Sequence, residues 1–205
     1  GGATRLSVMG IAPGFAITDE DLRIVPSTAV MGYVFGLDPT PIVDFVGTLR
    51  DETDEVDEAL TRLEQRTGMD LPGDLFEPLA PLCAFYTSAE TGSVGLMGSV
   101  LTMGLDDAPA FAARVGRLAD ELNRFAAEAL EEPGRRMGIG VRVRRTDHTQ
   151  GIAYTFQVPG IPFPAEPTLM VGERYAALAL WPAGAHVAIN QAHGRGDAGL
   201  LANPR

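Results

Sequence analysis

The clearest periodic pattern in the chain lies between Asp106 and Leu130, where apolar residues recur at intervals of four and three. This spacing places them on one side of an α-helix. Asp106 and Asp107 supply capping oxygens at its start, and Glu132-Pro133-Gly134 ends it. We therefore predict a helix over 107–130. Its apolar side contains Phe111, Val115, Leu118, Leu122, Phe125 and Ala129, and its polar side contains Arg114, Arg117, Asp120, Glu121, Arg124 and Glu128.

The preceding residues predict shorter elements. Residues 29–37 alternate large and small apolar side chains, as a strand does, with Met31, Tyr33, Phe35 and Leu37 on one side and Gly32 and Gly36 on the other. Asp38-Pro39-Thr40-Pro41 begins a helix, and an acidic run over 51–58 leads into a second helix that ends at Thr67-Gly68. The acidic run lacks the glycine and spaced oxygen ligands of a calcium loop, so we interpret it as a solvated helix N-terminus. A short helical turn within 70–82 and strands over 83–88 and 95–105 complete this part.

The last third reads as β-hairpins. Residues 141–144 and 152–158 alternate apolar and polar side chains around a turn at 146–151, and 169–171 and 174–181 flank Gly172-Glu173. A helix over 182–192 follows. The uncharged stretch 175–194 has the length of a membrane span, but it contains a proline and several polar side chains that a lipid-exposed helix would not tolerate together.

Together these elements predict an α+β fold: an antiparallel sheet of hairpins, covered on one face by the helix over 107–130 and by shorter helices over 40–66. We expect Phe111, Val115, Leu118, Leu122 and Phe125 to lie against the sheet face that carries Tyr154 and Phe156. Residues 23–205 then form one domain truncated at its C-terminus, and 1–22 are the tail of a preceding unit. Gly36-Leu37-Asp38 with Pro41 recurs as Gly104-Leu105-Asp106 with Pro109. Duplicated β-α units and convergence of strand-cap-helix chemistry both fit this recurrence.

The charge balance restricts the partners. Sixteen basic residues, all arginine, stand against twenty-seven acidic residues, giving a net charge of −11. A nucleic-acid binder or peripheral membrane domain needs a basic surface, so we expect neither partner. The single cysteine, Cys83, lies in an apolar run, where a buried thiol behaves as a small hydrophobic group. No pattern of cysteine and histidine suggests zinc, and we expect no metal or cofactor.

The candidate chemistry is sparse. Asp147-His148 is the only adjacent acid–imidazole pair, and a hydrolase using it would need a nucleophile within hydrogen-bond reach. No Gly-x-Ser-x-Gly motif is present. Arg142 and Arg144 alternate with inward-pointing valines. They can attract an anion, pair with upstream glutamates, or blunt the edge of a sheet.

Several structural motifs resemble a family. They are 25–28 (VPST), 68–75 (GMDLPGDL) followed by Pro78-Leu79, 104–106 (GLD) and 200–204 (LLANP). Residues 23–205 thereby resemble a widespread bacterial family of unknown function, with the pattern LPADT … GLDLxxDLxxxLG … SLxxNPxF. Here 25–28 lack the acidic residue of that pattern, and its terminal phenylalanine is missing. The resemblance implies an anchored or secreted protein of the cell envelope, and it brings no catalytic residues.

We therefore expect a non-catalytic extracytoplasmic domain of the envelope that associates with another protein or acts as a spacer. An alternative is a carrier whose sheet and long helix enclose an apolar cleft for a lipid or another hydrophobic ligand, lined by Met97, Met103, Phe111 and Phe156. A second alternative is the hydrolase that uses Asp147 and His148. The three functions differ in what should surround these residues.

Overall fold

The computed structural model describes residues 12, 14–92, 96–129, 140–158, 165–197 and 199. Its strands are β1 (Ala29–Gly36), β2 (Leu79–Ser88), β3 (Ser99–Leu105), β4 (Arg142–His148), β5 (Gly151–Gln157), β6 (Thr168–Val171) and β7 (Tyr175–Ala179). Its α-helices are α1 (Thr40–Glu52), α2 (Asp54–Thr67), α3 (Gly73–Phe76), α4 (Ala108–Ala129) and α6 (Pro182–Ala192). Short 3-10 turns lie at Asp21–Ile24, Ala89–Thr91 and Leu96–Gly98.

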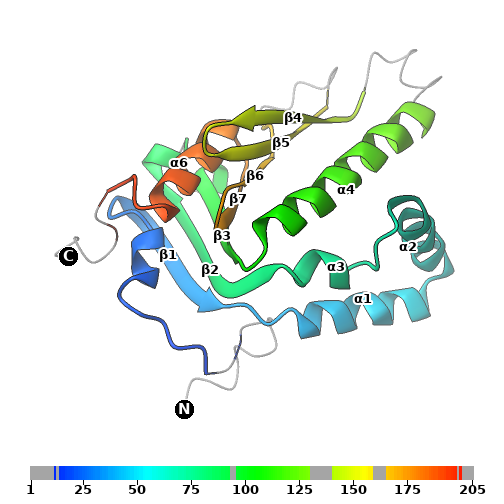
Figure 1. Cartoon of the computed structure of the whole chain (residues 1–205), viewed down its shortest axis with the longest axis horizontal. Coiled ribbons are helices and arrows are strands. Elements are labelled where there is room, and N and C mark those ends of the chain that lie inside the picture. The colour runs from blue at the N-terminus through cyan, green and yellow to red at the C-terminus, as the bar shows by residue number, and fades with distance from the viewer. Residues whose placement is uncertain are drawn as a thin grey trace.

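All seven strands form one antiparallel sheet in the order β1-β2-β3-β7-β6-β5-β4, which confirms the predicted α+β fold of hairpins (Figure 1). The turn between β4 and β5 is tighter than predicted, spanning only 149–150. Strand β2 begins at Leu79, earlier than predicted. Pro81 lies where the β2–β3 register shifts, so its missing N–H interrupts no regular ladder there.

The sheet is covered on both faces, a layer more than the sequence indicated. Helix α6 packs on the central strands through small side chains, and Ala177, Ala185 and Ala188 there are fully buried. The other face packs against the first half of α4, where Phe111 and Val115 meet Tyr154. Cys83, predicted to be buried, is 1% exposed, and burial raises the pKa of its thiol to about 12.

Helix α4 follows the sheet through only part of its predicted apolar side. Phe111 and Val115 are buried against the sheet, but Leu122 and Phe125 are 45% and 60% exposed. Smaller residues continue this side of the helix: Ala119 packs in the same cluster as Tyr154, and Ala126 is also buried. The prediction that the whole stripe faces Tyr154 and Phe156 is therefore wrong in its second half. The apolar arc of α4 is wider than one contact and is shared between two neighbours.

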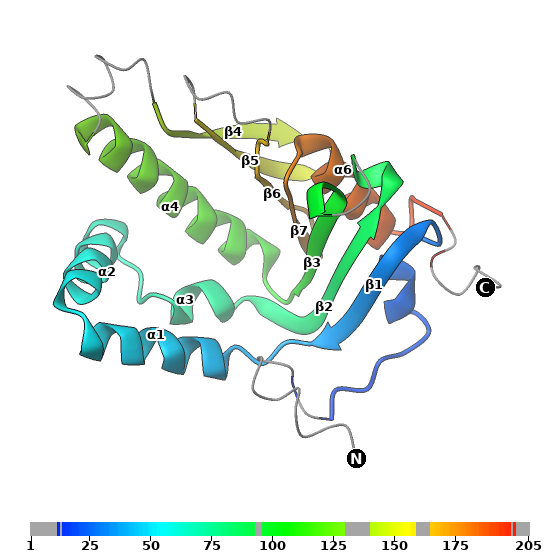
Figure 2. The same ribbon diagram turned by 180° about the vertical axis from the view of Figure 1, so that it is seen from behind.

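The two helices predicted over 40–66 form, but they extend away from the sheet instead of covering it (Figures 1 and 2). Helix α1 packs on α2, and α2 and α3 pack on α4. This arrangement follows from the sheet order. Strands β1 and β3 are both antiparallel to β2, so they run in the same direction, and the helices that follow them leave from the same end of the sheet. The repeated Gly-Leu-Asp turns thus set α1 and α4 on that end with α2 near both, while duplication stays a prediction.

The ends of the helices follow the local signals. Asp107 accepts a hydrogen bond from the backbone N–H of Ala110 at the start of α4, as predicted. Asp38 accepts one from the N–H of Thr40 at the start of α1. Gly68 ends α2 with φ of 66°, a left-handed conformation that favours glycine.

A charged network joins α1 to α2. The guanidinium of Arg50 donates to both carboxylate oxygens of Glu64 at 2.9 and 2.7 Å, and Glu64 also accepts from the N–H of Leu71. Arg50 also donates to Asp57 at 3.2 Å. The hydrogen bonds from Arg50 hold the pKa of the Glu64 carboxyl below its usual range. This bidentate pair fixes the angle of the α1–α2 hairpin.

This pair should make stability depend on pH. Because folding lowers the pKa of Glu64, its contribution is present above the unfolded value of about 4.3 and is lost as pH falls through the folded value. Glu64→Gln should therefore lower the urea midpoint at neutral pH, and its difference from the wild type should be smaller at pH 3, below the unfolded pKa of about 4.3. Glu58→Gln, in the exposed Glu58–Arg62 pair of the same helix, is the control and should change little at either pH. A gap between Glu64→Gln and wild type that is the same at both pH values would contradict the assignment.

Candidate functional site

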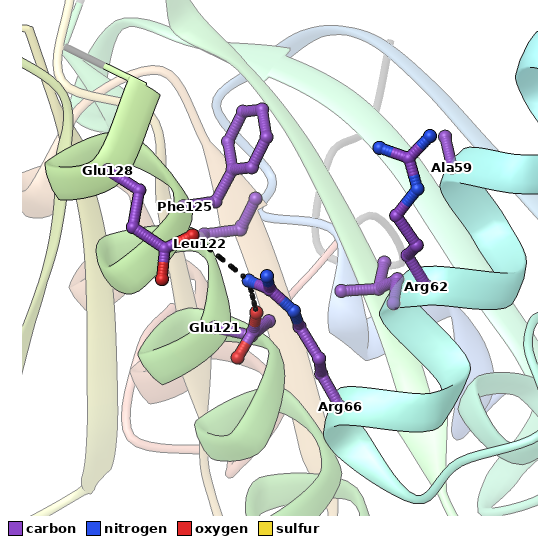
Figure 3. A pocket seen from close by; sticks show the side chains of 8 residues that line it. Ala59, Arg62, Arg66, Glu121, Leu122, Phe125 and Glu128 are labelled. Carbon is purple, nitrogen blue, oxygen red and sulfur yellow. Dashed lines mark hydrogen bonds and ion pairs between the residues drawn. The ribbon is translucent and has the colours of Figure 1, made fainter.

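An open groove of about 370 Å³ lies between α2 and α4 (Figure 3). Its apolar lining comes from Ala59 and Leu63 on α2 and from Leu122 and Phe125 on α4. Its charged lining consists of Arg62, Arg66, Glu121 and Glu128. Figure 3 shows Phe125 and Leu122 beside the gap between the two helices. Two large apolar side chains of α4 that do not reach the sheet are thus gathered at one surface.

Buried Glu121 joins the walls of the groove. It is 4% exposed, and its carboxylate accepts hydrogen bonds from Arg66 of α2 at 2.8 Å and from Arg124 at 2.6 Å. Arg66 also reaches Glu128 at 3.3 Å. Hydrogen bonds to Glu121 and then to Glu128 raise the pKa of Arg66. The sequence pattern predicts Glu121 on the polar side of its helix, but α2 packs against that side and makes it an interface.

Helices α1, α2 and α3 form a helical arm, and further polar contacts hold this arm beside α4. Arg114 of α4 donates to Glu77 at 2.5 Å and to the backbone oxygen of Asp74, both close to α3. Arg117 donates to the backbone oxygen of Thr67 at the end of α2 at 3.4 Å. The contacts between α4 and the arm are therefore largely polar at the turn near α3, and the apolar side chains that line the groove stay open.

The four side chains predicted to line a ligand cleft are not gathered in one hollow. Phe111 is 5% exposed in the core between α4 and the sheet, and Met103 packs against the same cluster. Phe156 is 37% exposed on β5, and Met97 is half-buried in a 3-10 turn before β3. In the part of the chain that the structure describes, none of them lines the α2–α4 groove, a hollow beside α6 or a hollow beside α3. Where Phe111 and Met103 meet, the sheet and helix enclose side chains rather than a cleft.

The acid–imidazole pair on β4 is held by different neighbours. The Asp147 carboxylate accepts from Arg145 at 3.2 Å, while the His148 ring contacts the His186 ring of α6 edge to face at 4.3 Å between centroids. Burial, and to a lesser extent the charge of His148, lower the pKa of His186. In the part of the chain that the structure describes, neither a hydroxyl nor a thiol hydrogen-bonds to His148. Among the described residues, Asp147 therefore does not orient the His148 ring.

The arginines of β4 lie at the edge of the sheet, as one interpretation of the sequence proposed. Arg142 and Arg144 are exposed on this edge strand, and Arg142 donates to Gln157 of β5 at 3.0 Å. Among the described residues, no three or more histidine, cysteine, aspartate or glutamate side chains gather as metal ligands. No described helix combines the length and apolarity that a bilayer span requires.

The role of Glu121 can be tested by truncation. Glu121→Ala removes the carboxylate that accepts from Arg66 and Arg124, and because these arginines are 42% and 57% exposed and can be solvated, it should cost about 1–2 kcal/mol of unfolding free energy. Glu128→Ala is the matched control, because Glu128 contacts the same Arg66 but is 55% exposed, and it should change stability by less than about 0.5 kcal/mol. Urea unfolding followed by far-UV circular dichroism measures both. Equal losses of unfolding free energy in the two variants would show that the burial of Glu121 adds nothing to stability.

Comparison with protein-family models, with curated proteins and with solved structures finds no match to this chain.

Proposed function

We propose that this chain is a non-catalytic association domain whose α2–α4 groove receives an apolar segment of a partner protein. The observation that carries the proposal is the pair Leu122 and Phe125, which lie exposed in a groove with Leu63 instead of in the core. Large apolar side chains gathered at one concave surface are typical of binding sites. A third amphipathic helix or an extended apolar segment can pack between two helices in this way.

The charges of the groove favour a protein segment over a lipid. Arg62 and Arg66 on one wall balance Glu121 and Glu128 on the other, so the lining carries no net charge for a fatty-acid carboxylate or a phosphate headgroup. A small-molecule site usually buries most of its ligand. Here both Leu122 and Phe125 are about half open to solvent, which suits a partner that brings its own covering surface. The lipid-carrier alternative becomes an outcome of the test.

A non-catalytic role is supported by the surroundings of Asp147 and His148, which are held by different partners. The cell-envelope location is part of the proposal and is supported only by the family resemblance. Fractionation of cells that produce the protein, with detection by antibody, tests the location independently of binding.

The groove is tested by site-specific photo-crosslinking in producing cells. A benzophenone amino acid replaces Leu122 in the groove or, in the matched control, Phe45 on α1, which is 61% exposed and does not line the groove. We expect the probe at position 122, but not at 45, to crosslink to one discrete polypeptide. That polypeptide should then bind the purified domain. Phe125→Asp should raise the dissociation constant of this complex by roughly thirtyfold or more, as expected for a central aromatic anchor.

Phe45→Asp is the control for the added charge and should leave the dissociation constant unchanged. Saturable binding of a fluorescent long-chain fatty acid to the purified protein, abolished by Phe125→Asp, would replace the proposal by the lipid carrier. Equal crosslinking from positions 122 and 45 would overturn the assignment of the groove.

A further inference from the structure

The two edges of the sheet differ in how well they are protected from pairing with another chain. Strand β4 forms one edge and β1 the other. The β4 edge carries exposed Arg142, Arg144 and Arg145. It is also covered at one point by Asn123 of α4, whose carboxamide bonds both backbone groups of Val143, at 2.6 Å from the Val143 N–H and 2.9 Å to its C=O. Charged side chains and a covering helix both protect an edge strand from pairing with another chain.

Among the described residues, the β1 edge has neither charged side chains nor a covering helix. Residues 29–36 (AVMGYVFG) contain no charged side chain and no proline. Val30, Met31 and Tyr33 are 69%, 42% and 59% exposed. A long, apolar and uncharged edge strand is a template for strand pairing. In a chain of net charge −11, this uncharged segment is also where a second acidic chain meets the least repulsion.

The hydrogen bonds at the end of β1 show which backbone groups are open. The Leu37 N–H bonds Pro81 on the β2 side, whereas the Gly36 C=O accepts from the Ala12 N–H. Because antiparallel ladders alternate, the even-numbered residues of β1 direct their N–H and C=O groups outward. Within the described residues, nothing hydrogen-bonds these groups of Gly32 and Val34. Because the Gly36 C=O already accepts a hydrogen bond from Ala12, the open segment is 31–35.

We infer that this segment pairs antiparallel with the same segment of a second copy, about a two-fold axis at Tyr33. Gly32 then lies opposite Val34 of the second copy, and each exchanges both backbone hydrogen bonds with the other. On the face shared with α4, Met31 meets Phe35 of the second copy and Tyr33 meets Tyr33 of the second copy. Apolar cross-strand pairs of this kind stabilise a sheet.

The choice of a second copy rests on symmetry and closure. The segment is apolar on both sides of Tyr33, so it matches itself when reversed, and it offers no charge with which to select a charged peptide. Since the β4 edge is protected, a β1-to-β4 contact that would propagate into a fibre is disfavoured, and β1-to-β1 pairing closes at two copies. Pairing also continues an apolar row that runs from Tyr33 through Phe85 and Leu101 to Leu178 across neighbouring strands.

The dimer is tested first by its mass and its response to charge. Sedimentation equilibrium over a range of concentrations should show a reversible monomer–dimer equilibrium for the wild type. Tyr33→Lys places like charges opposite each other at the two-fold axis and should weaken the dimer by roughly thirtyfold or more. Phe45→Lys is the matched control, since Phe45 is equally exposed on α1, and it should leave the equilibrium unchanged.

The register is tested by a disulfide. Tyr33→Cys brings two thiols together at a non-hydrogen-bonded pair, a spacing that a disulfide bridges, so mild oxidation should give a covalent dimer. Val30→Cys is more exposed but outside the pairing segment and should not crosslink, and buried Cys83 should not take part.

A wild type that remains monomeric at all concentrations overturns the inference. So does slow hydrogen exchange at the Gly32 and Val34 amides that is independent of concentration, because the chain itself would then cover the edge. A dimer unaffected by Tyr33→Lys also overturns it. Neither Tyr33 variant touches the α2–α4 groove, so failure here is distinguishable from failure of the crosslinking at position 122.

Discussion

The arrangement of this protein depends on the pairing of β1 and β3 with the same strand, β2. Because both are antiparallel to β2, they run in one direction, and both following helices leave from one end of the sheet. Helices α1 and α4 therefore flank a space into which α2 folds back (Figure 2). Helix α2 thereby lies beside α4, and the groove lies between these two helices.

The helical arm is held mainly by charged hydrogen bonds, in contrast to the rest of the fold. The core on the α6 side is built from buried alanines, isoleucines and valines together with Met170 and Tyr86. The arm instead relies on the Arg50–Glu64, Arg66–Glu121 and Arg114–Glu77 pairs. Guanidinium–carboxylate pairs fix geometry without requiring apolar burial. They hold α2 near α4 while Leu122 and Phe125 stay accessible.

Local signals in the sequence determined the secondary structure well. The caps at Asp107 and Asp38, the left-handed Gly68 and the alternating hairpin strands follow from interactions within a few residues, which do not depend on the rest of the fold. The α+β class follows in turn from the order of these elements. The residues of the candidate site could not be predicted from local signals in the same way. The four predicted cleft residues were chosen for size and hydropathy alone, and these properties do not distinguish a core side chain such as Phe111 from a groove side chain such as Phe125.

The sequence by itself determined that α4 is amphipathic, where it begins, and which residues share its sides. Only the tertiary structure decided that its apolar arc meets two neighbours, the sheet on the side of Ala119 and Ala126 and the α2 groove through Leu122 and Phe125. At about 100° per residue these two sets lie roughly a quarter turn apart on the helix, and alanine gives too weak a hydropathy signal to mark the sheet-facing side. The burial of Glu121 was also decided by the tertiary structure. A carboxylate is expected to be solvent-exposed unless it has a partner, and here the partner is Arg66 from another helix.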